Sequence, residues 1–135
     1  MKQFLIACLV LLAACNNESK YDIDSKDKYE NSKEALMATE KKNAARFITV
    51  KGNNKKNLIG QTVIKGTIYN SAKIVTYKDI DIKLAFYSKT GALLEEDHEI
   101  VYETVAPGGS KTFKSKYFTP RGTDSVAFTV IAAKF

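Results

Sequence analysis

The side chains that could do acid–base or metal chemistry gather in one short acidic stretch. His98 is the only histidine of the chain and lies between Asp97 and Glu99, with Glu95 and Glu96 just before it. An imidazole titrates near neutral pH and can bind a metal ion, so this group could form a weak metal or pH-sensitive site. A metal site needs several ligands at defined spacing. We therefore expect His98 to be an ordinary surface residue of an acidic strand.

Carboxylates at alternate positions also suggest glycoside hydrolysis. Two carboxyl groups about 5–10 Å apart across a cleft can cleave a glycosidic bond, which makes a hydrolase, or an inhibitor of one, an alternative function. Carboxylates along a single strand reach that spacing without any cleft. We interpret these side chains as a charged outer face, matched by Lys114 and Lys116 if the next strand pairs with theirs. The carboxylates in question are Glu95, Asp97, Glu99 and Glu103.

The serines and glycines carry no catalytic signature. No serine lies in a Gly-x-Ser-x-Gly motif, and there is no second histidine that could act as a base. The sequence Gly108-Gly109-Ser110-Lys111 lacks the spacing of a phosphate-binding loop and precedes a predicted strand, so we expect a turn there. We predict a non-enzymatic protein without a cofactor or a metal.

The strongest chemical signal is a cysteine near the N-terminus. Lys2 is followed by an apolar run over residues 4–14, which ends in Leu12-Ala13-Ala14-Cys15. A basic end, an apolar stretch and small residues before a cleavage site are the order of a secretory signal peptide. A membrane-spanning helix needs about 20 apolar residues, which is more than this run contains. We therefore expect residues 1–14 to be a signal peptide.

Leu12-Ala13-Ala14-Cys15 resembles a bacterial lipobox, with ordinary secretory cleavage as the alternative. The resemblance implies that the Cys15 thiol is acylated, becomes the new N-terminus and anchors the protein in a membrane. Asn16 is not the aspartate that marks inner-membrane retention in enteric bacteria, so the resemblance favours the outer membrane, with either face of it open. Cys8 is lost with the signal, so the mature chain has no thiol for a disulfide or a zinc site.

The next segment, residues 15–45, is predicted to be a polar tether. Residues 16–45 contain six lysines, seven acidic residues and neither proline nor glycine. Residues 21–31 hold too few apolar groups to fix a fold. Asn31 and Glu34 have the spacing of a capping box, which predicts a short helix over residues 32–45.

From residue 46 onward the pattern changes to strands. Ile80, Ile82, Leu84 and Phe86 alternate with other residues, as in a strand with one buried face. Glycine-, proline- and asparagine-rich turns separate similar runs. This regular spacing predicts one all-β domain over residues 46–135, an immunoglobulin-like antiparallel sandwich. Its strands are expected at 47–51, 60–70, 75–88, 92–104, 111–119 and 124–134.

Three segments of this domain carry a family resemblance. They are Ile64-x-Gly66-x-Ile68-x-Asn70-Ser71, Leu84-Ala85-Phe86-Tyr87-Ser88-x-x-Gly91 and Ala106-Pro107-Gly108-x-Ser110-x-x-Phe113. Together they resemble the FxLYD family, which comprises small immunoglobulin-like modules of bacterial envelope proteins, and similar lipoproteins of Bacteroidetes-type bacteria. The namesake motif differs here, because Leu84 and Phe86 are exchanged and Ser88 replaces an aspartate. The resemblance implies a fold and a cellular setting but no catalytic residues.

The charge balance bears on possible partners. Residues 46–135 contain fourteen Lys or Arg and eight Asp or Glu, a net charge of +6. Such a field favours lipopolysaccharide, acidic polysaccharide or anionic lipid headgroups, although scattered lysines can also serve solubility alone. Nucleic acid is not an expected partner of an exported lipoprotein. The densest basic group, our candidate anion contacts, is Lys111, Lys114, Lys116 and Arg121.

These observations predict a membrane-anchored, non-enzymatic module of the cell envelope. It would bind or scaffold an envelope protein, or alternatively bind an anionic glycan or lipid. Asp124-Ser125-Val126 also resembles the short O-glycosylation site of Bacteroidetes, which would place a glycan on Ser125.

Overall fold

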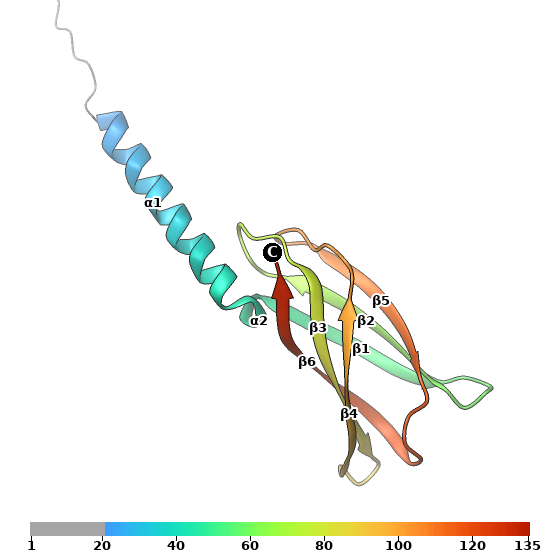
Figure 1. Cartoon of the computed structure of the whole chain (residues 1–135). Helices are drawn as coiled ribbons and strands as arrows, with labels where there is room; N and C mark the ends of the chain where they lie inside the picture. The colour runs from blue at the N-terminus through green and yellow to red at the C-terminus, as the bar shows by residue number, and fades with distance from the viewer. Residues whose placement is uncertain (1–20) are drawn as a thin grey trace, which may run out of the picture.

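The computed structural model describes residues 21–135, with side chains from residue 25 onward. The predicted signal peptide and the predicted acylation site Cys15 lie outside the described residues. A long helix, α1 (Tyr21–Lys42), and a short one, α2 (Ala44–Phe47), precede six strands. Figure 1 shows α1 projecting from one end of a two-layered β-structure. Among the described residues, no helix is both long and apolar enough to cross a membrane.

The strands form two antiparallel sheets packed face to face, so the prediction of an all-β sandwich is confirmed. The sheets have three strands each, in the orders β1-β2-β5 and β4-β3-β6. The predicted end of the first strand at residue 51 is wrong, because β1 continues through Gly52 and the chain turns back only at residues 57–61. The strands are β1 (Ile48–Lys56), β2 (Thr62–Asn70), β3 (Lys78–Ser88), β4 (Leu93–Val101), β5 (Ser110–Tyr117) and β6 (Thr123–Lys134).

The core lies between the two central strands, β2 and β3. Alternate side chains of each strand point inward, where their apolar surface is removed from water. This explains why the alternation in the sequence was clearest in these two segments. The fully buried aliphatic side chains of β2 and β3 are Ile64, Ile68, Ile80, Ile82 and Leu84.

Two glycines make room for aromatic rings inside the sandwich. Gly52 of β1 pairs with Gly66 of β2. A Cβ atom on Gly66 would lie 2.3 Å from the ring of Phe113, and one on Gly52 would lie 2.8 Å from the ring of Phe128. Gly52 therefore serves close packing within a strand, and a larger side chain there would displace a ring.

Helix α1 is longer than the sequence predicted. It begins at Tyr21, so residues 21–31 are helical and the capping box at Asn31 is wrong, because Asn31 lies inside the helix. The segment lacks proline and glycine, and opposite charges recur three and four residues apart, as in Lys26–Glu30 and Glu30–Lys33. Such pairs support an exposed helix that has no apolar stripe.

Glu40 joins the C-terminal end of α1 to the sandwich. Its side chain is fully buried, and its carboxylate accepts hydrogen bonds from the backbone amides of Lys73 (2.6 Å), Ile74 (3.0 Å) and Val75 (2.9 Å). The backbone carbonyl of Glu40 accepts a hydrogen bond of 2.8 Å from the hydroxyl of buried Tyr77. We call these four contacts the Glu40 latch.

The latch is charged at neutral pH. Burial raises the pKa of a carboxyl group, but the three amide hydrogen bonds outweigh burial here and hold the pKa of Glu40 below its ordinary value. Burial, and after it the negative charge of Glu40, raise the pKa of Tyr77. The phenol of Tyr77 therefore stays protonated and keeps its hydrogen bond to the helix.

Asn70 shapes the loop that the latch holds. Its side-chain amide donates hydrogen bonds to the carbonyls of Val75 (2.9 Å) and Val105 (3.0 Å). Its side-chain oxygen accepts a hydrogen bond of 2.9 Å from the amide of Ala72. Asn70 is buried, so these partners replace water completely.

The two ends of the sandwich differ. Strand β1 runs away from α2, and its hairpin with β2 lies at the end farthest from α1, as do the β3–β4 and β5–β6 turns (Figure 1). We call the end that carries residues 57–61, 88–92 and 118–122 the distal end. A surface at the distal end is therefore presented away from the helix.

Candidate functional site

The outer face of the β1-β2-β5 sheet carries a cluster of lysines. Inward-facing residues alternate with Val63, Lys65, Thr67 and Tyr69 on β2, which therefore point outward. Residues directly opposite in an antiparallel sheet share a face, and the register of β1 and β5 against β2 adds four further lysines. We call this surface the lysine face: Lys51, Lys55, Lys65, Lys114 and Lys116.

The lysine face has no compensating negative charge within its sheet. Strands β1, β2 and β5 contain no aspartate or glutamate. Among the ion pairs of the described residues, none involves a lysine of this face. Lys65 lies directly opposite Lys114, and like charges in that position repel each other. A bound anion would relieve this repulsion.

A shallow hollow lies over the distal half of the lysine face. It has a volume of about 750 Å³ and is open to solvent. Three of the lysines, Lys55, Lys65 and Lys114, contribute to its wall, together with Lys56 from the end of β1. Its other lining residues are Asn53, Asn54, Asn57, Leu58 and Val63, so amide donors and two aliphatic side chains accompany the ammonium groups.

The structure places the four candidate anion contacts on different surfaces. Lys114 and Lys116 belong to the lysine face. Lys111 pairs with buried Ile68 and therefore lies on the inner side of β5, where it is exposed at the edge of the sandwich. Arg121 lies in the β5–β6 turn at the distal end. The density of basic residues in the sequence therefore identified only part of the cluster.

Three lysines of the face escaped the sequence reasoning. Lys51, Lys55 and Lys65 come from β1 and β2, about 50 residues or more before β5 in the chain. The alternation in β2 indicates that Lys65 faces outward, but only strand order brings β1 and β5 to its two sides. The Glu40 latch was missed as well, because nothing local marks Glu40 among the other acidic residues of α1.

The acidic strand does not form the face that we predicted. Strands β4 and β5 belong to different sheets, so they do not pair as a hairpin and the predicted match with Lys114 and Lys116 is wrong. Glu95, Asp97 and Glu99 pair with inward-facing residues of β3 and lie on the inner side of β4. Glu95 and Asp97 remain accessible because β4 is an edge strand, whereas Glu99 is half-buried.

Glu99 fastens the two sheets to each other at this edge. Its carboxylate accepts a hydrogen bond from Ser115 (2.7 Å) and another from the hydroxyl of Tyr117, both on β5. The ring of Tyr117 in turn packs against Phe86, with 6.1 Å between the ring centroids. Glu99 therefore has a structural role that explains its place on the inner side of β4.

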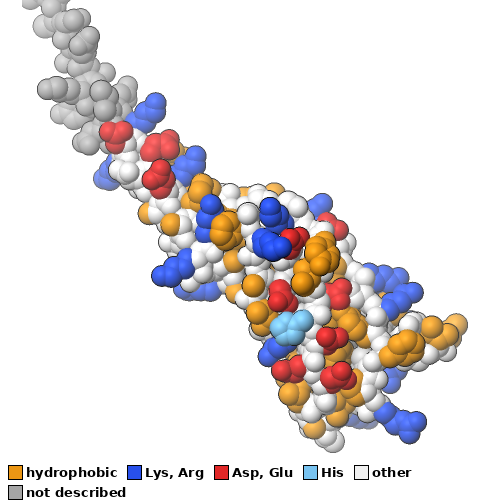
Figure 2. Space-filling model, viewed as in Figure 1, with side chains coloured by type: hydrophobic (Ala, Val, Ile, Leu, Met, Phe, Trp, Pro, Cys, Tyr) orange, Lys and Arg blue, Asp and Glu red, His pale blue; other side chains and the backbone are white. Residues whose placement is uncertain are grey.

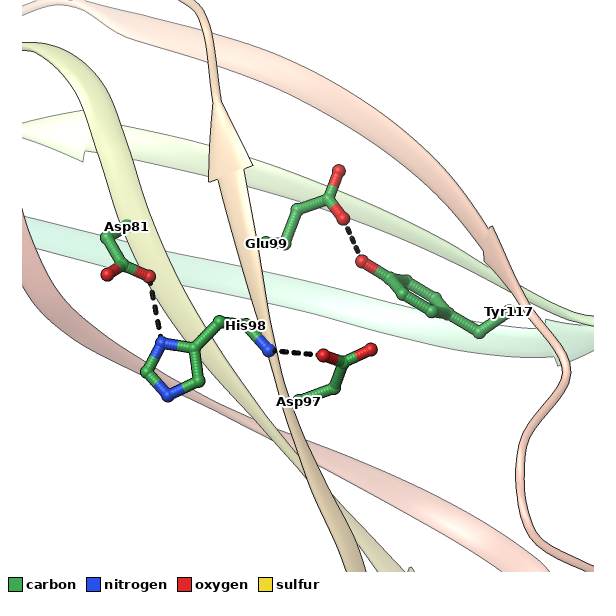
Figure 3. Close-up of polar contacts among 5 residues, drawn as sticks. All are labelled: Asp81, Asp97, His98, Glu99 and Tyr117. Atoms are coloured by element: carbon green, nitrogen blue, oxygen red, sulfur yellow. Dashed lines mark hydrogen bonds and ion pairs between the residues drawn. The ribbon is translucent and has the colours of Figure 1, made fainter.

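His98 leaves β4 on the opposite side from Glu99 (Figure 3). Its Nδ1 atom lies 3.1 Å from a carboxylate oxygen of Asp81, and its backbone amide donates to Asp97. The ring is about half exposed. Within residues 21–135, no group of three or more His, Cys, Asp or Glu residues lies close enough to hold a metal ion. His98 is a surface residue that bonds to a neighbouring strand.

The β4-β3-β6 sheet has the opposite charge. Figure 2 shows acidic side chains and the single histidine on the face formed by β4 and its neighbours. Its cations are partly neutralised, because Lys83 pairs with Glu96 and Lys134 pairs with Asp79, each at 3.1 Å. The molecule is therefore electrostatically two-sided: the lysine face is its basic side, and no ion pair among the described residues neutralises it.

Comparisons with known proteins add no relative. No protein-family model matches this chain, and searches of the curated proteins and of the solved structures find no match either.

Proposed function

We propose that this protein is a lipid-anchored, non-enzymatic binding module of the bacterial cell envelope. It attaches to a membrane through acylated Cys15, with the outer membrane favoured, and contacts a second envelope component through the lysine face. The observation that carries the proposal is the lysine face itself, with five ammonium groups and no carboxylate on its three strands. The ligand is a component rich in phosphate or carboxylate groups.

Electrostatics explains why such a face binds rather than merely keeps the protein soluble. Charged residues that serve solubility are usually a mixture of both signs, whereas neighbouring lysines carry the same charge, repel each other and lower stability. Each lysine close to an anionic surface contributes about 1 kcal/mol of attraction. The hollow over Lys55, Lys65 and Lys114 lets an anionic group approach several of them at once.

Helix α1 serves as the spacer of this module. A helix of 22 residues is about 33 Å long, and the Glu40 latch fixes its last turn to the sandwich. The domain is thereby held off the anchoring membrane with its distal end directed outward. The FxLYD-like setting remains part of the proposal, and it is compatible with a two-sheet sandwich.

A hydrolase is a weaker candidate. Glu95 and Asp97 are exposed on an edge strand, and Glu99 is engaged by Ser115 and Tyr117. A glycosidase needs two carboxylates facing each other across a bound sugar. We therefore propose binding rather than catalysis, with an anionic ligand favoured over a protein partner because of the charge of the face.

Neutralising two central lysines is expected to weaken anion binding. For Lys65→Gln with Lys114→Gln, the loss of about 2 kcal/mol corresponds to a roughly 30-fold higher Kd. The measurement is titration of the detergent-solubilised full chain with long-chain polyphosphate at low ionic strength. Binding by the wild type should weaken as salt is added, because salt screens these charges.

The matched control carries the same change in charge on α1. Lys26→Gln with Lys28→Gln removes two exposed cations far from the lysine face, and it should leave the Kd within about twofold. An equal loss in both double variants would mean that only net charge matters. That result, or the absence of polyphosphate binding by the wild type, would refute the proposal.

Replacing Cys15 tests the anchor separately. Cys15→Ala removes the thiol that carries the lipid, so the precursor should incorporate no radiolabelled palmitate. Cys8→Ala is the control, since the proposal removes Cys8 with the signal, and this variant should be labelled like the wild type. Label in the Cys15 variant would show that acylation takes place elsewhere.

A further inference from the structure

The tip of the β1–β2 hairpin exposes two large aliphatic side chains. Leu58 is fully exposed and Ile59 is 71% exposed. Figure 2 shows hydrophobic side chains protruding at this tip, at the right of the view. An exposed aliphatic pair at the end of a projecting hairpin gains nothing from the folded domain, so it indicates contact with something apolar outside it.

The hairpin is built so that this pair is held away from the sandwich. Both the backbone and the side chain of Asn57 close the turn. Its side-chain oxygen accepts hydrogen bonds from the backbone amides of Ile59 (3.1 Å) and Gln61 (2.9 Å), and its backbone amide donates to the backbone carbonyl of Gln61 (2.9 Å). Gly60 completes the turn with a φ of 81°, which suits glycine. The tip is therefore preorganised, and Leu58 and Ile59 cannot fold back onto the sheet without breaking the hydrogen bonds of the turn.

Cations surround the base of the aliphatic tip. Lys55 and Lys56 end β1 directly before the turn, and Leu58 lines the same hollow as these two lysines and Lys65. At the same end of the sandwich, Phe118 is 79% exposed next to the β5–β6 turn that holds Arg121. Apolar side chains at the apex and cations behind them match the layering of a membrane surface.

We propose that the distal end docks on an anionic lipid bilayer. In this inference, which rests on the proposed function of the lysine face, Leu58 and Ile59 enter the boundary between headgroups and acyl chains while the lysines bind lipid phosphates. Because the hairpin and α1 lie at opposite ends of the domain (Figure 1), the docked bilayer is a second surface, distinct from the membrane that holds the proposed lipid anchor. Anionic lipid is thus the ligand class that we assign to the lysine face.

An anionic bilayer accounts for both the exposed aliphatic tip and the lysines behind it. Each of the other possible occupants accounts for only one of these two features. An acidic polysaccharide would satisfy the lysines, but it has no apolar interior to receive Leu58 and Ile59. A groove on a partner protein could bind the aliphatic tip, but that protein would also need carboxylates placed over the open lysine face. A lipid surface offers phosphate groups and hydrocarbon at successive depths, as basic amphipathic elements use them.

Tryptophan fluorescence gives a direct measure of insertion. The chain contains no tryptophan, so Ile59→Trp places a single reporter at the tip and keeps an apolar side chain there. With the acylated protein anchored in neutral phosphatidylcholine vesicles, addition of vesicles containing phosphatidylglycerol should shift the emission to the blue. Brominated acyl chains in the added vesicles should quench it. Ile131→Trp, on the acidic sheet, should show neither effect.

Capture of the second vesicle tests the role of the aliphatic pair. Leu58→Ser with Ile59→Ser should reduce binding of phosphatidylglycerol vesicles at least tenfold, because two aliphatic side chains are no longer transferred from water into the bilayer. Ile59→Ser alone, at a side chain that does not line the hollow, should also weaken vesicle capture and should still bind polyphosphate with the wild-type Kd. Ile100→Ser with Ile131→Ser, at 45% exposed positions of the other sheet, is the matched control and should capture vesicles normally.

The outcomes separate the two proposals. If the Leu58 and Ile59 double variant captures anionic vesicles as well as the wild type does, the docking inference is wrong while the lysine face stands. If polyphosphate is bound and vesicles are not, the ligand is a soluble polyanion or glycan and the docking inference is again wrong. If the wild type binds neither probe, the proposed function itself fails.

Discussion

Replacing Glu40 by alanine is expected to lower the free energy of unfolding by about 3 kcal/mol or more. Each hydrogen bond to a charged group contributes about 1.5–3 kcal/mol, and three backbone amides lose their acceptor at once. The amide of Val75 is buried, so water cannot readily replace the carboxylate there. Urea titration measures the loss, and the amide of Val75 should exchange its hydrogen much faster.

The control for this variant lies on the same helix. Glu34→Ala removes an exposed carboxylate from α1 and should change the free energy of unfolding by less than about 0.5 kcal/mol. If Glu40→Ala were equally mild, the latch would not hold the helix to the sandwich. In that case α1 could not act as a spacer of fixed direction.

Acid should release the same latch. The pKa of Glu40 is lower in the folded protein than its ordinary value, so as the pH falls the unfolded chain takes up a proton before the folded protein does. The stabilisation is complete above the ordinary carboxyl pKa and is lost as the pH falls through the lowered one. The stability difference between the wild type and Glu40→Gln should therefore shrink on going from pH 6 to pH 3. A difference that stays constant with pH would mean that the charge on Glu40 is irrelevant.

Asn70→Asp is expected to be similarly damaging, although the two side chains have nearly the same shape. The aspartate loses both amide hydrogens and directs a negative charge at the carbonyls of Val75 and Val105. A buried carboxylate that keeps only the Ala72 amide as a donor is costly, and we expect a loss of about 3–5 kcal/mol at neutral pH. Thermal and urea unfolding would measure the change.

The pH dependence of this variant should run opposite to that of the latch. A carboxyl group facing two carbonyls has a raised pKa in the folded state, and its protonated form can donate one hydrogen bond. Asn70→Asp should therefore recover stability relative to the wild type as the pH falls. Asn54→Asp, at a half-buried side chain with a single weak bond of 3.3 Å, is the control and should cost little. Equal stability of the two variants would contradict the role given to Asn70.

The strands were predictable because their signal is local. Ile80, Ile82 and Leu84 alternate with partly exposed residues, and the period of two follows from the geometry of a single strand. The same reasoning gave the end of β1 wrongly. Gly52 is followed by two asparagines, which is a composition typical of turns. Only the close approach of the Phe128 ring shows why a glycine is needed at this position of the strand.

The helix was underestimated for a related reason. Few apolar residues in residues 21–31 argued against folded structure, but oppositely charged side chains three and four positions apart support a helix that has no apolar stripe. What fixes its direction is Glu40, whose partners lie more than 30 residues later in the chain. No pattern within the helix reveals which glutamate is buried.

The sequence by itself determined the class of fold, the basic charge of the domain and the prediction that Cys15 carries a lipid. These depend on periodicity, composition and a short motif, all of which are local properties. Only the tertiary structure decided which lysines act together, because Lys65 meets Lys114 through strand order and register. It also decided that Leu58 and Ile59 are exposed beside them, because the exposure of a side chain at a hairpin tip depends on where the turn lies relative to the sheet behind it.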